Sequence, residues 1–319
     1  MTTETPPRTT MTELLPGFVE YLSVERRFAP STIFSYKNGI QWFIRDLGNL
    51  PAADIGMQHF ISLKSRMQIR GARESRVSGV IAAVKSLLGY ARDIRGIPVL
   101  KLEDVKGPRP PRREVVYLKR DELRRFLEAI PLRTWEAGPR LTGYRFRALS
   151  EVLVASGMRI GETLALNRNS IDFEHRTARV VGKGNKERTV FFTPRSLQWL
   201  TRYLDMRRDK GEALFATEAG KRIRSNGVQG MFGRITKRAG LEKHVTPHVL
   251  RHTTATLLLG KGCPMGHIKQ ILGHDRLETT CRYYLGILDD TDVQKAHHTY
   301  MNLDENDDPP LTRLPEALD

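Results

Sequence analysis

Cysteine is scarce in this chain of 319 residues, which contains only Cys263 and Cys281. Two cysteines cannot build a disulfide framework, so we expect the reducing cytoplasm as the compartment. Long apolar runs are missing too: none reaches the roughly 20 residues that a membrane helix needs, and the first ten residues lack the apolar core of a signal peptide. We therefore expect no membrane partner.

The motifs of metal and nucleotide sites are also missing. His248 and His252 have the spacing of the H-E-x-x-H zinc motif, but Val249 stands where that motif has its glutamate. The two cysteines form no C-x-x-C pair. The glycine-lysine turn at 182–186 lacks the spacing of a P-loop. We therefore expect neither a metal nor a cofactor.

Positive charge, by contrast, is abundant. The chain has 52 Lys and Arg against 36 Asp and Glu, a formal net charge of +16 and a pI near 10.1. Such a surplus favours a polyanionic partner, because neutralising a nucleic acid releases its condensed counterions. A merely basic protein without such a partner is the alternative, and we rank nucleic acid ahead of it.

The first part of the chain, residues 11–98, predicts an all-helical domain that follows a flexible arm at 1–10. Apolar residues recur at helical spacing in the segments 14–26, 30–48, 54–70 and 73–95. Basic side chains, with Arg73 and Arg76 among them, occupy the outer faces. Such a basic face either grips a duplex backbone or is simply solvated.

The stretch 99–116 loses the helical pattern and is rich in proline and arginine, which predicts a semi-rigid linker between domains. Charge keeps a linker solvated, but Arg109, Arg112 and Arg113 could also neutralise phosphates as the linker passes DNA.

A second domain is expected over residues 117–303, before an acidic flexible tail at 304–319. Its helices are predicted at 119–130, 144–156, 194–208 and 225–238. Strand patterns occur at 170–173, 177–181 and 188–192, and the turn at 182–186 joins the last two as a hairpin. The sequence predicts a mostly helical α+β domain with a small antiparallel sheet.

The most informative stretch is residues 246–284. His248 and Arg251 lie three positions apart at the start of an apolar-periodic helix, so they share one face of it. A second helix ends at Gly273, and His274 follows directly, where a side chain can face a cleft. In a third short helix, Tyr284 falls on the apolar stripe and Tyr283 on the more polar face. We therefore expect Tyr283 to be the reactive tyrosine.

Together these residues resemble a catalytic signature. H-x-x-R, then L-G-H, then T-T-x-x-Y resembles the signature of tyrosine recombinases, the phage-integrase and Xer-like family. The resemblance implies that His248, Arg251, His274 and Tyr283 are active-site groups. Many relatives follow the tyrosine with a T-H-V-type sequence, whereas this chain continues Tyr284-Leu285-Gly286. Tyr284 is therefore kept as the alternative nucleophile.

Two further segments resemble motifs of the same family. S-G-M-R-I-G-E resembles its first arginine motif, which implies that Arg159 is the second active-site arginine and that Glu162 orients or charge-balances it. V-V-G-K-G-N-K resembles its hairpin lysine, which implies that Lys183 protonates the leaving 5′ oxygen. Lys186 is the alternative to Lys183, and Lys186 and Arg188 are further candidates for contacts with DNA.

The chemistry explains why these residue types are needed. A phenol with a pKa near 10 must lose or share its proton to attack a phosphodiester. The transition state gathers negative charge on the non-bridging oxygens, which the planar fork of arginine suits. Lysine or histidine can protonate the leaving oxygen. No nucleotide is required, because a phosphotyrosine ester conserves the energy of the broken bond.

The resemblance also implies the architecture and the reaction. It implies an all-α, SAM-like core-binding domain, a mixed α+β catalytic domain, and site-specific DNA cutting and rejoining through a Holliday junction. The implied partners are double-stranded DNA and other copies of the chain, as a tetramer with exchange of the C-terminal helix, and a second recombinase or accessory protein is a further candidate. We expect a bacterial, nucleoid-associated enzyme of Xer-like or mobile-element type. The alternatives are a type IB topoisomerase-like enzyme and a non-catalytic DNA-binding regulator.

Overall fold

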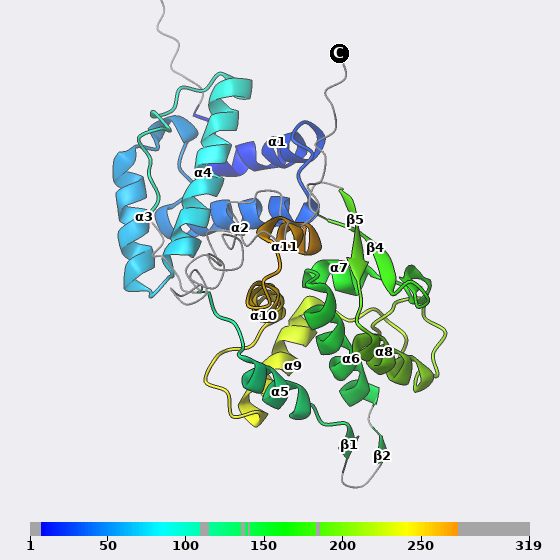
Figure 1. Cartoon of the computed structure of the whole chain (residues 1–319). Coiled ribbons are helices and arrows are strands. Elements are labelled where there is room, and N and C mark those ends of the chain that lie inside the picture. The colour runs from blue at the N-terminus through cyan, green and yellow to red at the C-terminus, as the bar shows by residue number, and fades with distance from the viewer. Residues whose placement is uncertain (1–7, 109–114, 135–137, 140, 183–185, 274–319) are drawn as a thin grey trace, which may run out of the picture. The chain divides into compact units, whose positions relative to one another are not determined.

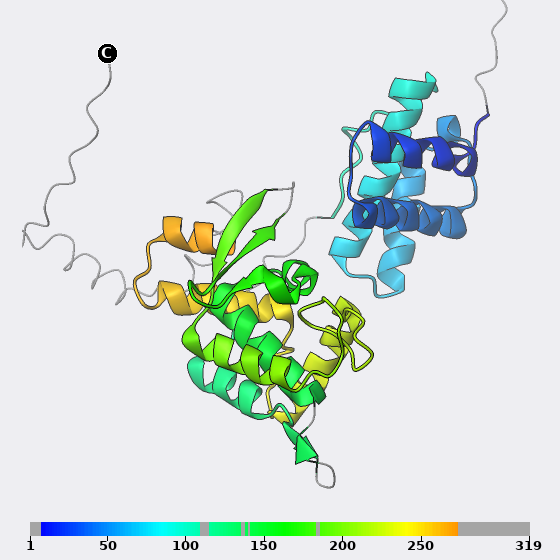
Figure 2. The same cartoon turned by 90° about the vertical axis from the view of Figure 1, so that its right-hand side faces the viewer.

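The computed structural model describes residues 8–108, 115–134, 138–139, 141–182 and 186–273 (Figures 1 and 2). The chain divides into two compact units, Met1–Arg113 and Glu114–Asp319. Each unit has its own hydrophobic core, and we describe each by itself.

The described part of the first unit is helical. Its elements are α1 (Met11–Val24), α2 (Pro30–Leu47), the 3-10 turn η1 (Ala52–Asp54), α3 (Met57–Ile69) and α4 (Glu74–Arg95). Helix α1 begins with a capping box, in which Thr10 N–H donates to Glu13 Oε2 at 2.7 Å. Helix α4 ends at Gly96, whose φ of +63° favours glycine. The prediction of four helices is confirmed, with ends that differ by up to three residues.

The core of the first unit is built around the contact of α2 with α4. Gly39 of α2 makes this contact close: a Cβ there would lie 2.8 Å from the Cβ of Ala83. Phe18, Phe43 and Phe60 fill the remaining space and are fully buried. Burial of each such ring contributes about 1.5–3 kcal/mol.

The segment that follows α4 also belongs to this core. Leu102 and Val105 are buried in it, and Lys85 Nζ donates to the carbonyl of Val105 at 2.8 Å. The first residues of the predicted linker at 99–116 are therefore packed, because two apolar side chains hold them on α4 without any helical periodicity.

The second unit is mostly helical with a small sheet. Its helices are α5 (Arg120–Glu128), α6 (Leu141–Ser156), α7 (Ile160–Ala165), η2 (Arg168–Ser170), α8 (Pro194–Asp205), α9 (Ser225–Arg238), α10 (Pro247–Leu259) and α11 (Met265–Leu272). Helix α6 is buried along most of its length and packs against α5, α8 and α10. This unit confirms the predicted fold class, and the bounds of α9 are those predicted.

The sheet of the second unit has three antiparallel strands in the order β3 (Ile171–Asp172), β4 (Thr177–Val181) and β5 (Glu187–Phe191). Val180 pairs with Arg188, and Val181 pairs with Glu187 next to the turn. A separate ladder joins β1 (Arg133–Thr134) to β2 (Gly138–Pro139). In Figures 1 and 2 this ladder and the β4–β5 hairpin lie at opposite ends of the unit.

One prediction tests the close contact of α2 with α4. Gly39→Ala places a Cβ against Ala83, whose own Cβ cannot rotate away. Overpacking of about 1–3 kcal/mol exceeds the roughly 1 kcal/mol of helix propensity that alanine adds. We expect a lower melting temperature for the full chain, measured by calorimetry.

The matched control is Gly79→Ala on α4, where a Cβ meets nothing within 4 Å. It gains the same helix propensity without the overlap, so its melting temperature should not fall. Equal shifts for the two variants would contradict this account of the contact.

Candidate active site

The site is assembled around a helix junction in the second unit. Helix α10 begins at its N-cap Thr246, whose hydroxyl accepts from Val249 N–H at 3.2 Å, and Pro247 follows in the first turn. This start places His248 and Arg251 one turn apart. Arg251 is 3% exposed, and its Nη1 donates to the carbonyl of Gly157 at 2.6 Å.

Gly157 explains how α10 meets the end of α6. Its φ is +61°, and a Cβ there would lie 2.7 Å from the Leu272 side chain and 3.5 Å from Thr254. Only glycine meets both requirements without strain. Because Arg159 follows two residues later, the bond from Arg251 to Gly157 brings the two predicted arginines to one place.

Arg159 is the N-cap residue of α7. Its main-chain N–H donates to Glu162 Oε2 and its Nη1 to Glu162 Oε1, both at 2.9 Å. Its Nη2 donates to the carbonyl of Gly273 at 3.1 Å. The side chain is still 38% exposed, so part of the guanidinium remains available to a ligand.

Glu162 is the central anion of this group, with a side chain 6% exposed. Burial alone would raise the pKa of its carboxyl. The hydrogen bonds and positive charges of Arg188 and Arg159 outweigh burial and lower that pKa to about 2. The carboxylate is therefore ionised at neutral pH and balances charge between two guanidinium groups.

His248 lies at the solvent-accessible start of α10. The protein around its ring disfavours the charged form, and Arg251 and Arg159 repel it, so the pKa of His248 is lowered. Its ring centroid is 4.4 Å from that of His252 in an edge-to-face arrangement. The neutral imidazole that results can accept a proton at neutral pH.

The predicted site residues of the linker and the second unit thus separate into three groups. Arg159, Glu162, Arg188, His248 and Arg251 are described and come from α7, β5 and α10. Lys186 is exposed at the end of the hairpin turn, where its carbonyl accepts from Gly182 N–H at 2.8 Å. Predicted residues that lie outside the described part of the chain are Lys183, His274, Tyr283, Tyr284, Arg109, Arg112 and Arg113.

Arg73 and Arg76 belong to the first unit. Arg73 is the N-cap residue of α4, and both arginines are exposed. Arg76 lines a shallow surface hollow with Tyr36, Asn38 and Trp42 of α2. Polar, aromatic and cationic side chains in one hollow suit a nucleic-acid backbone.

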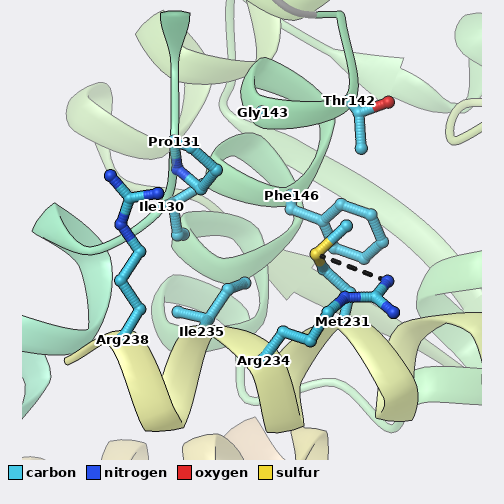
Figure 3. A pocket seen from close by; sticks show the side chains of 9 residues that line it. All are labelled: Ile130, Pro131, Thr142, Gly143, Phe146, Met231, Arg234, Ile235 and Arg238. Atoms are coloured by element: carbon cyan, nitrogen blue, oxygen red, sulfur yellow. Dashed lines mark hydrogen bonds between the residues drawn. The ribbon is translucent and has the colours of Figure 1, made fainter. Parts of the chain in front are cut away.

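A separate cavity of about 370 Å³ lies elsewhere in the second unit. It is formed by Met231 and Ile235 of α9 and Phe146 of α6, with Arg234 and Arg238 at its edge (Figure 3). Arg234 Nη2 approaches Met231 Sδ at 3.9 Å. Of the predicted catalytic side chains that the structure describes (Arg159, His248 and Arg251), none lines this cavity.

The described residues contain no group of three or more His, Cys, Asp and Glu side chains that could hold a metal ion. No helix among them is both long and apolar enough to cross a membrane.

A buried arginine, a second arginine held by a buried carboxylate and an accessible histidine lie on a mostly helical fold with a small sheet. Such a group of side chains is suited to an enzyme that acts on phosphodiesters. The sequence pattern of the Phage integrase family matches residues 117–289. The chain therefore belongs to the phage integrase family, the tyrosine recombinases, and is an enzyme that cuts and rejoins DNA.

Relatives and solved structures agree with this assignment. Tyrosine recombinase XerC of Chlamydia muridarum (strain MoPn / Nigg) is 31% identical over 294 residues, which cover 84% of this chain and 91% of XerC. A solved chain of the Tn1549 transposon integrase, residues 82–397 in complex with transposon right end DNA, is 18% identical with a TM-score of 0.74, over 92% of this chain and 100% of that solved chain. A lambda integrase tetramer bound to a Holliday junction is 19% identical with a TM-score of 0.70, over 87% and 78%. The recombinase assignment is thus confirmed, and the topoisomerase-like alternative is not favoured.

One prediction concerns His248. Because its pKa is lowered, NMR titration of its ring should give a midpoint below 6.5, the ordinary value. In Arg159→Gln one repelling charge is lost, and the midpoint should rise. His248→Gln assigns the resonance, and a midpoint unmoved by Arg159→Gln would contradict the proposed repulsion.

A second prediction concerns Glu162. Its folded pKa of about 2 lies below the ordinary value of 4.5 for a glutamate, so its contribution to stability is complete above pH 4.5 and is lost as the pH falls toward 2. Glu162→Gln should lower the free energy of unfolding at pH 7 by about 3 kcal/mol. In urea titrations, the difference in the free energy of unfolding between the variant and the wild type should decrease below pH 4.5. A difference that did not depend on pH would refute the ion-pair account.

Proposed function

We propose that this protein is an Xer-like site-specific recombinase that breaks each DNA strand by attack of Tyr283 on a phosphodiester. The observation that carries the proposal is the bond from Arg251 to the Gly157 carbonyl, which joins α10 to the segment that presents Arg159. Two guanidinium groups from distant parts of the chain thereby face one region, as a clamp on a phosphate requires.

Arg251 and Arg159 are suited to different roles in binding the phosphate that is attacked. Arg251 is buried, and its Nη1 is held by the Gly157 carbonyl, so its charge is weakly screened by solvent where a phosphate approaches. Arg159 is more exposed and is held by Glu162, which orients its fork. Together they stabilise the charge that gathers on the non-bridging oxygens during attack.

Side chains of this protein supply the nucleophile and all proton transfers of the proposed cleavage step. The phenolic oxygen of Tyr283 forms a bond to phosphorus, and the bond from phosphorus to the 5′ oxygen breaks. Neutral His248 helps to remove the phenolic proton, and Lys183 gives a proton to the leaving 5′ oxygen. His274 donates to a non-bridging oxygen. Attack of a 5′ hydroxyl on the 3′-phosphotyrosine reverses these steps and seals a strand.

The hairpin supports the role of Lys183. Gly182, the residue before it, lies next to Glu162: a Cβ on Gly182 would be 3.5 Å from Glu162 Oε1. The turn of the hairpin therefore starts beside the carboxylate that holds Arg159. Lys186, on the far side of the same turn, is the alternative donor.

The proposed assembly is a tetramer on two DNA sites that exchanges strands through a Holliday junction. The similarity to the lambda integrase tetramer bound to a Holliday junction supports it, as does the similarity to XerC. The C-terminal helix is proposed to dock on a neighbouring copy, and a second recombinase or an accessory protein is a proposed partner. The enzyme is proposed to act on DNA within the bacterial nucleoid.

DNA is proposed to be gripped by both units and by the linker between them. The candidates for backbone contacts are Arg73, Arg76, Arg109, Arg112, Arg113 and Lys186. The exposed arginines of α4 and the net charge of +16 support this proposal.

The nucleophile is tested with a nicked suicide substrate, which loses its 5′ hydroxyl-bearing fragment after cleavage and traps the covalent adduct. Tyr283→Phe should abolish the adduct because it removes the attacking oxygen, whereas Tyr284→Phe should retain it. Denaturing gels that detect the protein–DNA adduct measure the outcome. An adduct that survives in Tyr283→Phe and disappears in Tyr284→Phe would move the nucleophile by one residue.

A further inference from the structure

We infer that Arg188 is a positioning residue of the recombination site, which holds Glu162 and through it Arg159, and so ties the β-hairpin to the phosphate clamp. The inference rests on the proposed function of that clamp. It gives Arg188 a role inside the protein, which differs from the contact with DNA that its place in a basic hairpin predicts.

The strand geometry directs Arg188 inward. Side chains alternate along β5, and Arg188 lies on the same face as buried Val190. Its side chain is only 15% exposed, against 38% for Arg159. A strand-borne arginine that pointed to solvent would be on the face of Thr189 and Phe191.

The guanidinium of Arg188 forms a bidentate pair with Glu162. Its Nη1 donates to Oε1 at 3.0 Å and its Nη2 to Oε2 at 2.8 Å. Arg159 also bonds both carboxylate oxygens, Oε1 with its Nη1 and Oε2 with its main-chain N–H. Each oxygen of Glu162 thus accepts one hydrogen bond from each arginine, so the carboxylate is a bridge fixed from two sides.

Arg188 also contacts the end of α11. A Cβ on Gly273 would lie 2.7 Å from Arg188 Nε and 2.8 Å from its Cδ and Cζ, so the guanidinium packs directly on that glycine. The carbonyl of the same residue accepts from Arg159 Nη2 at 3.1 Å. The Arg188 side chain therefore links strand β5 to Glu162, which holds Arg159, and to Gly273, the residue before His274.

This arrangement leaves Arg188 poorly placed to grip DNA. Two of its donor groups are engaged with Glu162, and the Nε–H is buried with no acceptor among the described residues. A change at Arg188 should therefore alter the rate of cleavage and leave DNA affinity largely intact. Residues that orient a reacting group in this way typically change activity by about 10–100-fold.

The test compares Arg188→Gln and Arg188→Lys with Arg179→Gln in the full chain. Arg179 lies on β4 of the same sheet and is exposed, and it forms the matched control. Single-turnover cleavage of a suicide substrate is measured at saturating protein, and DNA affinity is measured over a range of salt. We expect Arg188→Gln to cleave about 10–100-fold more slowly, Arg188→Lys to recover part of the rate, and Arg179→Gln to cleave at the wild-type rate.

A double variant separates action through Glu162 from a direct contact. In a Glu162→Gln background the bridge is already broken, so adding Arg188→Gln should slow cleavage no further. The slope of log affinity against log salt should not change in Arg188→Gln, whereas loss of a phosphate contact would reduce it by about 1.

Three outcomes would overturn the inference. A reduced salt slope with a normal cleavage rate at saturation would make Arg188 a DNA contact. Loss of both the melting transition and DNA binding in the Gln and Lys variants would make it purely structural. Additive losses in the double variant would break the link to Glu162. If the wild-type chain itself formed no adduct, the proposed function would fail, and not this inference alone.

Discussion

The hydrogen bond from buried Arg251 to the carbonyl of Gly157 is the constraint on which the rest of the site depends. A charged guanidinium at 3% exposure is stable only if its donors are satisfied. Meeting that requirement fixes the first turn of α10 against the end of α6. It also requires glycine at 157, where the backbone is left-handed and Leu272 approaches closely. The positions of His248 and Arg159 follow from this single junction.

Some of the cationic side chains of this chain are exposed on the surface, and others are buried. In the second unit, Arg145 donates to the Ala216 carbonyl, Arg147 to the Leu127 carbonyl, and Arg207 to Asp209. These side chains are almost fully buried. Arg145 links α6 to a loop, Arg147 links α6 to α5, and Arg207 holds together the loop that follows α8. Part of the +16 charge therefore stabilises the fold. Counterion release on binding DNA draws on the remaining, exposed cations.

How much could be predicted from the sequence depended on the range of the interactions involved. Long periodic segments such as α9 were found with their bounds, because amphipathic spacing is local. The six-residue helix α7 was missed, since one and a half turns give no periodic signal. Arg159, Glu162, His248 and Arg251 were identified by motif, but not how they meet. The pairing of Arg188 with Glu162 joins residues that lie 26 positions apart, and no local pattern encodes it.

The charges around Glu162 suggest a reason for the positioning role that we propose for Arg188. Glu162 is shared by Arg159 and Arg188, so its one negative charge is bonded by two positive side chains. A phosphodiester enters with one negative charge, and attack gathers further negative charge on its oxygens. Without Arg188, Glu162 would cancel most of the charge of Arg159, and the clamp would match the ground state better than the transition state. Only stabilisation that grows toward the transition state accelerates the chemical step. Burial of the His248 ring, followed by repulsion from Arg251 and Arg159, lowers the pKa of that histidine and favours the form that accepts a proton.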